Sequence, residues 1–305
     1  MFLEPRMPSP ARLTAADFDP QVLILFDAYV HGDLDRRGFL QRVGAIVGSA
    51  AAIGVLAALS PQFASAQQVP TDDSRIATEY LEFDSAEGYG RGRGYLAYPA
   101  DATAALPAVL VIHENRGLNP HIEDVTRRLA LEGYLAFAPD ALFPLGGYPG
   151  NEDEARTLFA TLDQTRCRAD FLAASAVLQS HSRSNGKLGA VGFCYGGGMV
   201  GYLATRLPSL LAAAPYYGGP APLDDVPNIR AEMLVVLASD DERINASWPA
   251  YQSVLEAAKV RYALFQPANT QHGFHNDTTP RYSEAAAREA WEKTLALFDR
   301  QLRKT

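Results

Sequence analysis

The chain has 305 residues, 48% of them hydrophobic and 20% charged, with a formal net charge of −8 at pH 7. These proportions are those of a folded globular protein and exclude a disordered or fibrous chain. An acidic balance without a dense cluster of Lys and Arg argues against nucleic acid or an anionic membrane as a partner. The two cysteines provide no disulfide framework and no Cys/His spacing fits zinc, so we expect no metal and no organic cofactor.

Residues 1–66 have the features of a twin-arginine export signal. The segment Asp35-Arg36-Arg37-Gly38-Phe39-Leu40-Gln41 precedes the apolar run 43–59, and Ala64-Ser65-Ala66 is an A-x-A cleavage sequence. We therefore expect cleavage after Ala66 and a periplasmic or secreted protein without stable membrane association. An uncleaved membrane anchor and an ordinary N-terminal helix are the alternatives, because the stretch before the arginines is unusually long and 22–29 can form a helix.

After a polar linker at 67–75, the remaining chain alternates between strand and helix patterns. A hairpin at 77–83 and 94–98 opens the domain, and buried strands are expected at 108–113, 134–138, 188–193, 211–217, 233–237 and 261–265. Helices are expected at 119–132, 152–180 with one break, from 196 onward, 248–258 and 284–303, the last burying Ala287, Trp291, Leu295 and Phe298. This alternation predicts one α/β domain over 76–305, with a mostly parallel sheet covered by helices on both faces.

A cysteine with a glycine two residues away on each side lies between the strand at 188–193 and the helix that follows it. Gly192-x-Cys194-x-Gly196 is the nucleophile-elbow pattern with cysteine in the place of serine. The sharp turn needs glycine on either side, because side chains there would collide with the neighbouring strand or helix. At a helix N-terminus the sulfur is favoured as thiolate, so the pattern predicts covalent catalysis; a buried structural cysteine is the alternative.

An activated cysteine needs a base and a group that orients the base. Asp241 and His272 follow later strands in the order nucleophile, acid, histidine. Asp240 is the rival acid and His275 the rival base; we prefer Asp241 because Asp240 suits a turn, and His272 because Gly273 lets the loop turn inward. The remaining histidines lie in the predicted leader (His31) or at strand and helix ends (His113, His121 and His181).

The segment after the strand at 108–113 supplies further candidates. Glu114 directly follows a strand expected beside the elbow strand, so its carboxylate could hold or accept the thiol proton, although a solvated loop carboxylate is the alternative. The oxyanion of acyl transfer would be bound by the backbone N–H groups of Tyr195 and Asn115. His113-Glu114 is not a zinc motif, because no second histidine follows.

In combination these motifs resemble the dienelactone hydrolase family (carboxymethylenebutenolidases), which are cysteine hydrolases with the α/β-hydrolase fold. The resemblance covers about residues 76–302 and rests on segments in one order: 111–117 (VIHENRG), 133–140, 192–197 (GFCYGG), 241–245 and 272–274 (HGF). It implies a triad of Cys194, His272 and Asp241. It also implies that Glu114 matches the family glutamate that interacts with the cysteine before substrate arrives.

The chain departs from the family where a substrate carboxylate would be held. Members that open dienelactone use arginines there, whereas Asn276 occupies one of those positions; Arg116, Arg156 and Arg281 are candidate replacements or surface residues. We expect a hydrolase that opens a small-molecule lactone or activated ester through a thioester acyl-enzyme. A general carboxylesterase and a non-catalytic ligand-binding relative are the alternatives. The sequence specifies neither the oligomeric state nor the natural substrate.

Overall fold

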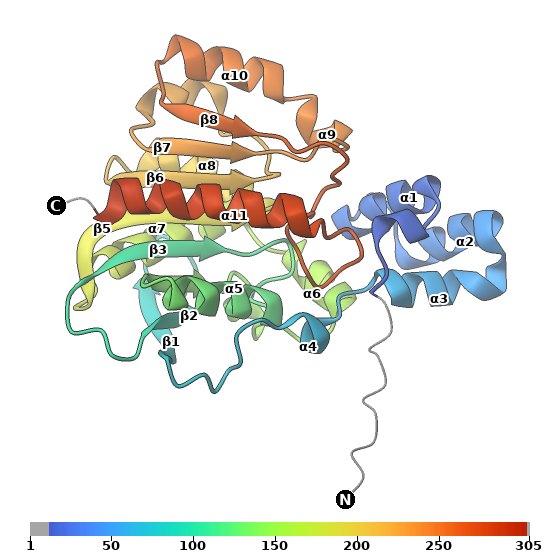
Figure 1. The fold of residues 1–305 in the computed structure, drawn as a ribbon, viewed down its shortest axis with the longest axis horizontal. Helices are drawn as coiled ribbons and strands as arrows, with labels where there is room; N and C mark the ends of the chain where they lie inside the picture. Colours follow the sequence, from blue (N-terminus) through green and yellow to red (C-terminus); the bar gives the residue numbers. More distant parts are fainter. Residues whose placement is uncertain (1–11, 304–305) are drawn as a thin grey trace, which may run out of the picture.

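The computed structural model describes residues 12–303 and is organised around one sheet (Figure 1). The strand order is β1-β2-β4-β3-β5-β6-β7-β8. The first pairings, β1 with β2 and β2 with β4, are antiparallel, and every later pairing is parallel. The predicted mostly parallel sheet is confirmed. Residues 1–11 of the predicted signal and 304–305 of the predicted domain lie outside the described residues.

The strands occupy nearly the ranges that the sequence predicts. Their bounds are β1 (Ile76–Ser85), β2 (Gly90–Pro99), β3 (Leu106–Ile112), β4 (Leu135–Pro139), β5 (Ser184–Phe193), β6 (Leu210–Tyr216), β7 (Glu232–Val236) and β8 (Tyr262–Phe265). Alternate side chains of β3 enter opposite cores: Leu110 and Ile112 pack on one face of the sheet, and Val109 and Val111 on the other. Both faces must therefore be covered by helices.

Two helices cover one face of the sheet, α5 (Pro120–Leu131) and α11 (Glu284–Phe298). The other face packs against α6 (Glu152–Phe159), α7 (Gln164–Ser180), α8 (Tyr195–Arg206) and α10 (Trp248–Ala257), with the short α9 (Glu242–Asn245) before α10. The side chain of Asn119 caps α5, accepting the Ile122 N–H at 3.2 Å, and proline at the first helical position fits the start of a helix.

The predicted buried side of the last helix is confirmed, since Ala287 and Phe298 are buried and Trp291 and Leu295 pack against the same core. The other buried residues of α11 are Ala286, Ala290, Thr294 and Leu297. Trp291 and Leu295 are half-buried on the flank, and the Trp291 ring lies 5.5 Å from that of His275. The alanine-rich stripe lets the helix approach the sheet closely, and Trp291 packs against the core at the edge of this contact.

The predicted leader folds as a set of helices beside the sheet domain, a name we use for residues 76–303. We call α1 (Pro20–His31), α2 (Arg36–Val47) and α3 (Ser49–Leu59) the helical unit; the short α4 (Phe63–Ala66) follows it. The unit stands at the edge where the parallel strands end (Figure 1). It has its own apolar core, which includes Val22, Phe26, Phe39, Leu56 and Leu59. Burial of each large apolar side chain contributes about 1.5–3 kcal/mol.

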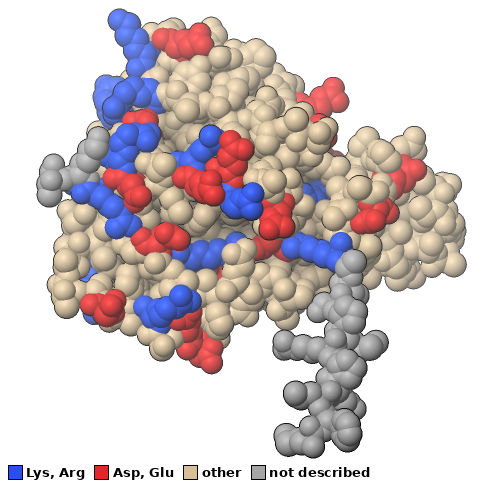
Figure 2. Space-filling model, viewed as in Figure 1, with Lys and Arg blue, Asp and Glu red and all other residues tan. Residues whose placement is uncertain are grey.

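Of the described helices, none is by itself both long and apolar enough to cross a membrane. Together α2 and α3 meet the length and composition required, but they are bent by 116° at their junction. Figure 2 shows basic and acidic side chains interspersed over the sheet domain, while the visible face of the helical unit is mostly uncharged. Ile24 on α1 and Ile53 on α3 are exposed.

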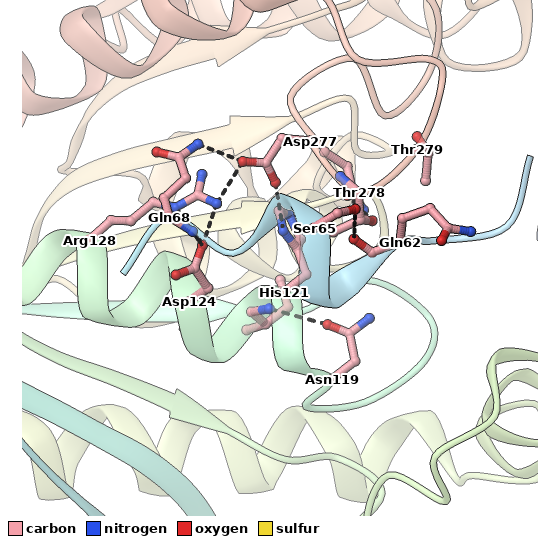
Figure 3. A network of polar contacts seen from close by, with 12 residues as sticks. Gln62, Ser65, Gln68, Asn119, His121, Asp124, Arg128, Asp277, Thr278 and Thr279 are labelled. Carbon is pink, nitrogen blue, oxygen red and sulfur yellow. Dashed lines mark hydrogen bonds and ion pairs between the residues drawn. The ribbon is translucent and has the colours of Figure 1, made fainter. Parts of the chain in front are cut away.

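A buried polar network ties the segment after the helical unit to the sheet domain (Figure 3). Asp277 accepts hydrogen bonds from Arg128 at 2.7 Å and from Gln68 at 2.5 Å, and it lies 3.2 Å from His121. Burial raises the pKa of the Asp277 carboxyl, but these three partners outweigh it and hold the pKa well below its usual range. The carboxylate is therefore ionised and paired inside the protein.

The same segment is held by backbone groups on either side of the predicted cleavage sequence. The Gln62 N–H donates to the Thr278 carbonyl at 2.8 Å. The Val69 N–H donates to the Asp124 carboxylate at 2.8 Å. The sequence around Ala66 consequently lies against α5 and the loop that precedes α11.

The turn between β5 and α8 has the geometry of the predicted elbow. Cys194 has a φ of 54° and a ψ of −111°, a conformation that costs free energy for any residue other than glycine. A Cβ atom at Gly192 would collide with the carbonyl of Gly196, and one at Gly196 with the carbonyl of Ile112. Both glycines are therefore required by backbone packing.

We predict that Gly196→Ala destabilises the protein by about 3 kcal/mol, because the new methyl group meets a backbone carbonyl that cannot move aside. Gly198→Ala, two residues further along α8, meets no atom closer than 3.5 Å and serves as the matched control. Its effect should stay within about 1 kcal/mol of wild type. Urea unfolding of both variants measures this, and equal destabilisation would contradict it.

Candidate active site

The sulfur of Cys194 lies at the carboxyl edge of the sheet, where five chain segments meet. Glu114 follows β3, Cys194 follows β5 and Tyr217 follows β6, while Asp241 and His272 come from the loops after β7 and β8. Because the parallel strands end at this edge, residues far apart in sequence are neighbours here. Cys194 is partly exposed, whereas Asp241 and His272 are each 4% exposed.

Asp241 and His272 form the pair that the sequence predicts. The distance from Asp241 Oδ2 to His272 Nδ1 is 2.6 Å, so the carboxylate orients the ring and leaves Nε2 toward the sulfur. Asp241 also accepts the Ile244 N–H at 3.3 Å, which fixes the carboxylate at the start of α9. The rival acid, Asp240, is exposed and accepts the Ser239 hydroxyl at 2.7 Å.

The rival histidine, His275, points away from the triad into the core. Its ring stacks on Phe193 with centroids 5.0 Å apart. Burial and the nearby Arg128 lower the pKa of His275 to about 3. A neutral, enclosed imidazole stacked in this way belongs to the packing of the core and not to proton transfer at the sulfur.

The electrostatics around Cys194 and His272 favour a thiolate on the first and an imidazolium on the second. Burial raises the pKa of the Cys194 thiol, but the charge of His272 and hydrogen bonds from His272 and His31 outweigh burial and lower the pKa to about 6. Burial lowers the pKa of His272, but the Cys194 thiolate and the Asp241 carboxylate outweigh it and raise the pKa to about 10. Cys194 and His272 titrate as a coupled pair, and both are charged between about pH 6 and about pH 10.

Glu114 lies beside the site but is bound to another residue. Its Oε2 accepts a hydrogen bond from Asn276 Nδ2 at 3.1 Å. Asn276 itself accepts the Thr278 hydroxyl and N–H, which fix the orientation of its amide. The position where the resemblance implies an arginine therefore holds an amide that positions Glu114. Both residues line the cavity described below.

The two residues predicted to bind an oxyanion flank the sulfur. Tyr195 is the first residue of α8, and its ring packs edge-on against Phe159 with centroids 4.7 Å apart. Asn115 lies in the loop after β3, and its side chain donates to the Val30 carbonyl at 3.1 Å. Both residues stand next to Cys194 at the rim of one groove.

All three arginines considered for substrate binding contact α1. Arg281 pairs with Asp27 at 3.1 Å, and Arg116 donates to the Val30 carbonyl at 3.2 Å. Arg156 donates to the Tyr29 carbonyl, and its guanidinium lies 4.4 Å from the centre of the Tyr29 ring. Arg116 also pairs with Glu152 at 3.1 Å and donates to the Asn115 side-chain oxygen.

A histidine that the sequence analysis left in the leader lies against the triad. The Nε2 atom of His31 is 3.6 Å from Cys194 Sγ, 3.3 Å from His272 Nε2 and 2.9 Å from an Arg243 nitrogen. On its other side, Nδ1 is 2.8 Å from the Asp27 carbonyl oxygen and 3.3 Å from the Asp27 carboxylate. The amphipathic stretch 22–29 before the twin arginines was the only sequence signal for this contact.

The same three side chains are the candidate metal ligands of the site. The donor atoms of His31, Cys194 and His272 lie within 4.8 Å of one another, and two imidazoles with a thiolate are donors that zinc accepts. The Arg243 guanidinium, however, already contacts the His31 nitrogen that would bind the ion. Because this positive charge lies where a cation would bind, we assign no metal to the cluster.

A cavity of about 330 Å³ leads to the sulfur. Its walls come from the sheet domain and from the helical unit together: Glu114, Arg116, Cys194, His272 and Arg281 face Phe26, Tyr29, Val30 and His31. A groove of about 340 Å³ reaches Cys194 and His31 from another side, past Tyr195 and Arg243. A small organic molecule fits either space.

Comparison with known proteins identifies the fold and the enzyme class. The model of the "Dienelactone hydrolase family" matches residues 93–302. The chain belongs to the dienelactone hydrolase family. Its sheet domain therefore has the α/β-hydrolase fold, and the protein is a hydrolase of the carboxymethylenebutenolidase-like kind. A second model, described as YqhI-like, matches residues 9–47, which include His31 and both arginines of the predicted signal.

Individual relatives of this dienelactone hydrolase family member agree. An Escherichia coli protein named "Putative carboxymethylenebutenolidase" is 31% identical over 261 residues, covering 80% of this chain and 94% of the relative. A solved structure from Klebsiella pneumoniae, titled "Putative Dienelactone Hydrolase", is 29% identical with a TM-score of 0.64, covering 73% and 98%. Dienelactone hydrolase from Anabaena variabilis shares the fold at 19% identity, with a TM-score of 0.59 and coverage of 75% and 100%.

We predict that iodoacetamide alkylates Cys194 of this hydrolase with a midpoint near pH 6, because His272 stabilises the thiolate. In His272→Ala the midpoint should rise toward the value of an ordinary thiol, about 8.5. Alkylation at pH 7 would then slow markedly. Peptide mass mapping separates Cys194 from Cys167, whose burial raises the thiol pKa to about 12. A wild-type midpoint near pH 8.5 would refute the ion pair.

Proposed function

We propose that the protein opens a lactone or cleaves an activated ester with Cys194 as the nucleophile, through a thioester acyl-enzyme. The observation that carries this proposal is the sulfur on the elbow, reached from a cavity and adjoining the His272–Asp241 pair, whose nitrogen and oxygen are 2.6 Å apart. These are the parts that covalent acyl transfer requires: a nucleophile, a base and a group that orients the base.

In the acylation step the Cys194 thiolate attacks the carbonyl carbon of the substrate. A C–S bond forms, and the electron pair of the carbonyl moves to its oxygen, where the N–H groups of Tyr195 and Asn115 are the proposed donors. The intermediate then collapses, the C–O bond to the alcohol breaks, and the leaving oxygen takes the Nε2 proton of His272. The acyl group is left as a thioester on Cys194.

In the deacylation step a water molecule attacks the thioester. His272, now neutral, accepts a proton from the water through Nε2, while Asp241 stabilises the imidazolium that forms. The C–S bond breaks and releases the carboxylic acid product, and the resting pair of thiolate and imidazolium is restored. Amides are poor substrates for such a site, because their nitrogen must be protonated before it leaves.

The charges of the cavity support an uncharged substrate. Three arginines line it, Arg36, Arg116 and Arg281, and each is paired with a carboxylate: Asp153 at 2.8 Å, Glu152 at 3.1 Å and Asp27 at 3.1 Å. An anionic substrate would have to break one of these pairs, at the cost of leaving a carboxylate without its partner. We therefore propose neutral lactones and esters as the preferred substrate class.

We predict that Cys194→Ala lowers kcat/KM for p-nitrophenyl acetate by about 10³-fold or more, because no other group can form the acyl-enzyme. Cys167→Ala is the matched control, since it removes the other cysteine, which is fully buried in the core. Stopped assays with purified protein measure both variants. Turnover that survives in Cys194→Ala would sink the proposed mechanism, and a wild type without turnover would favour a ligand-binding relative.

The preference for neutral substrates gives a further prediction. The rate with p-nitrophenyl acetate should exceed that with the anionic p-nitrophenyl hemisuccinate by about tenfold or more in kcat/KM. Raising the ionic strength should narrow this gap, because salt weakens the arginine–carboxylate pairs that an anionic substrate has to break. A hemisuccinate rate that matches or exceeds the acetate rate contradicts the assignment of the substrate class.

A further inference from the structure

The helical unit is joined to the catalytic edge of the sheet domain by specific contacts. One turn of α1 supplies three of them: the Asp27 carboxylate pairs with Arg281, and the Val30 carbonyl accepts from Asn115 and Arg116. Arg281 also lies 5.2 Å from the centre of the Phe26 ring. Because side chains of the sheet domain bind a backbone carbonyl of α1, they fix both the position and the register of this helix.

These contacts place the end of α1 at the reacting sulfur. His31 is the last residue of the helix, and Gly32 with a φ of 90° ends it there. The Asp27 carboxylate, one helical turn earlier, faces Nδ1 of the His31 ring, so Nε2 is directed toward Cys194. His272 is oriented in the same way by Asp241. The sulfur thus lies beside two imidazoles, each oriented by a carboxylate.

The helical unit forms a wall of the cavity and does not fill it. Phe26, Tyr29, Val30 and His31 line the same space of about 330 Å³ that reaches Cys194. A segment that plugged the site would leave no such route to the sulfur. In its absence this side of the cavity would be open to water, and Arg281 would lose the carboxylate it binds.

We propose that the helical unit is a permanent part of the working enzyme, in which α1 walls the substrate cavity and His31 acts on Cys194 as a second catalytic histidine. This inference rests on the proposed function, since it assigns a further residue to the same nucleophile. His31 shares with His272 the task of holding the sulfur ionised until the substrate carbonyl arrives. A chain cleaved after Ala66 would lack both the wall and this histidine.

The sulfur and His31 are surrounded by charged groups from several elements. These are Asp27 on α1, Arg243 on α9, Glu114 after β3, Asp241 after β7, and His272 and Arg281 after β8. Burial lowers the pKa of His31, but Asp27 and the Cys194 thiolate outweigh it and raise the pKa above its ordinary value. This shift favours the imidazolium form of His31 beside the thiolate, while the positive charges of His272 and of Arg243, 2.9 Å from Nε2, oppose it.

The experiment compares His31→Ala, His31→Gln and wild type as full chains. Alkylation of Cys194 by iodoacetamide is followed from pH 5 to pH 9 by peptide mass mapping, together with kcat/KM for p-nitrophenyl acetate. Loss of one charged hydrogen-bond partner should raise the alkylation midpoint of His31→Ala by about one pH unit and slow the reaction at pH 6 by up to about tenfold. The rates should converge at pH 9, where the thiol is ionised in both proteins.

The conservative variant and a control on the same helix separate catalysis from structure. His31→Gln keeps a nitrogen donor near the sulfur without a titrating charge, so its midpoint should lie between those of His31→Ala and wild type. Ile24→Ala alters the exposed face of α1, where the side chain is 69% exposed, and should match wild type in both assays. Thermal melting of each variant checks that the fold is intact.

Three outcomes would overturn the inference. The first is an unchanged alkylation profile in His31→Ala, and the second is faster ester turnover, which would make the helical unit an inhibitory plug. The third is an active enzyme, purified from the producing organism, whose intact mass and N-terminal sequence show that it begins at Gln67. Alkylation reports on the sulfur whether or not an ester is turned over, so this test can fail independently of the proposed function.

Discussion

The site depends on the strained turn that holds the Cys194 sulfur above the sheet. Its φ of 54° persists because β5 and α8 fix the chain on both sides, and because Gly192 and Gly196 allow backbone groups to touch where any side chain would collide. Once the turn fixes the sulfur, the loops that follow the neighbouring parallel strands bring Asp241 and His272 to it. The energetic cost of one unfavourable residue is thus offset by the packing of the entire sheet.

Charge around the sulfur is arranged in linked pairs. Asp241 orients His272, and His272 stabilises the Cys194 thiolate. Because the two charges stabilise each other, the pKa of Cys194 is lowered to about 6 and that of His272 is raised to about 10. The three arginines that line the cavity, Arg36, Arg116 and Arg281, follow a similar rule, since each is already paired with a carboxylate. A cavity built in this way concentrates its electrostatic effect at the Cys194 sulfur and carries little net charge on its walls.

The helical unit gives the site a second source of residues. In the sequence it has the marks of an export signal, and the twin arginines at the start of α2 are exposed in the structure. Export and cleavage after Ala66 therefore stay predictions. Cleavage and these contacts are hard to reconcile. A segment that is removed contributes nothing to the mature enzyme, yet α1 has carbonyl, carboxylate and imidazole groups that contact partners around Cys194.

The local pattern of the sequence determined the sheet domain and the choice of Cys194, Asp241 and His272 as candidate site residues. Short apolar runs bounded by turn residues indicate buried strands, the glycine spacing around Cys194 indicates a tight turn, and the ends of the strands predict where Asp241 and His272 meet the sulfur. What only the tertiary structure decided depends on contacts between distant segments. His31 lies 163 residues from Cys194, and neither periodicity nor spacing reports which helix docks against an edge. The pairing of Arg116, Arg156 and Arg281 with α1 was hidden for the same reason, because charge complementarity acts in space and leaves no repeat along the chain.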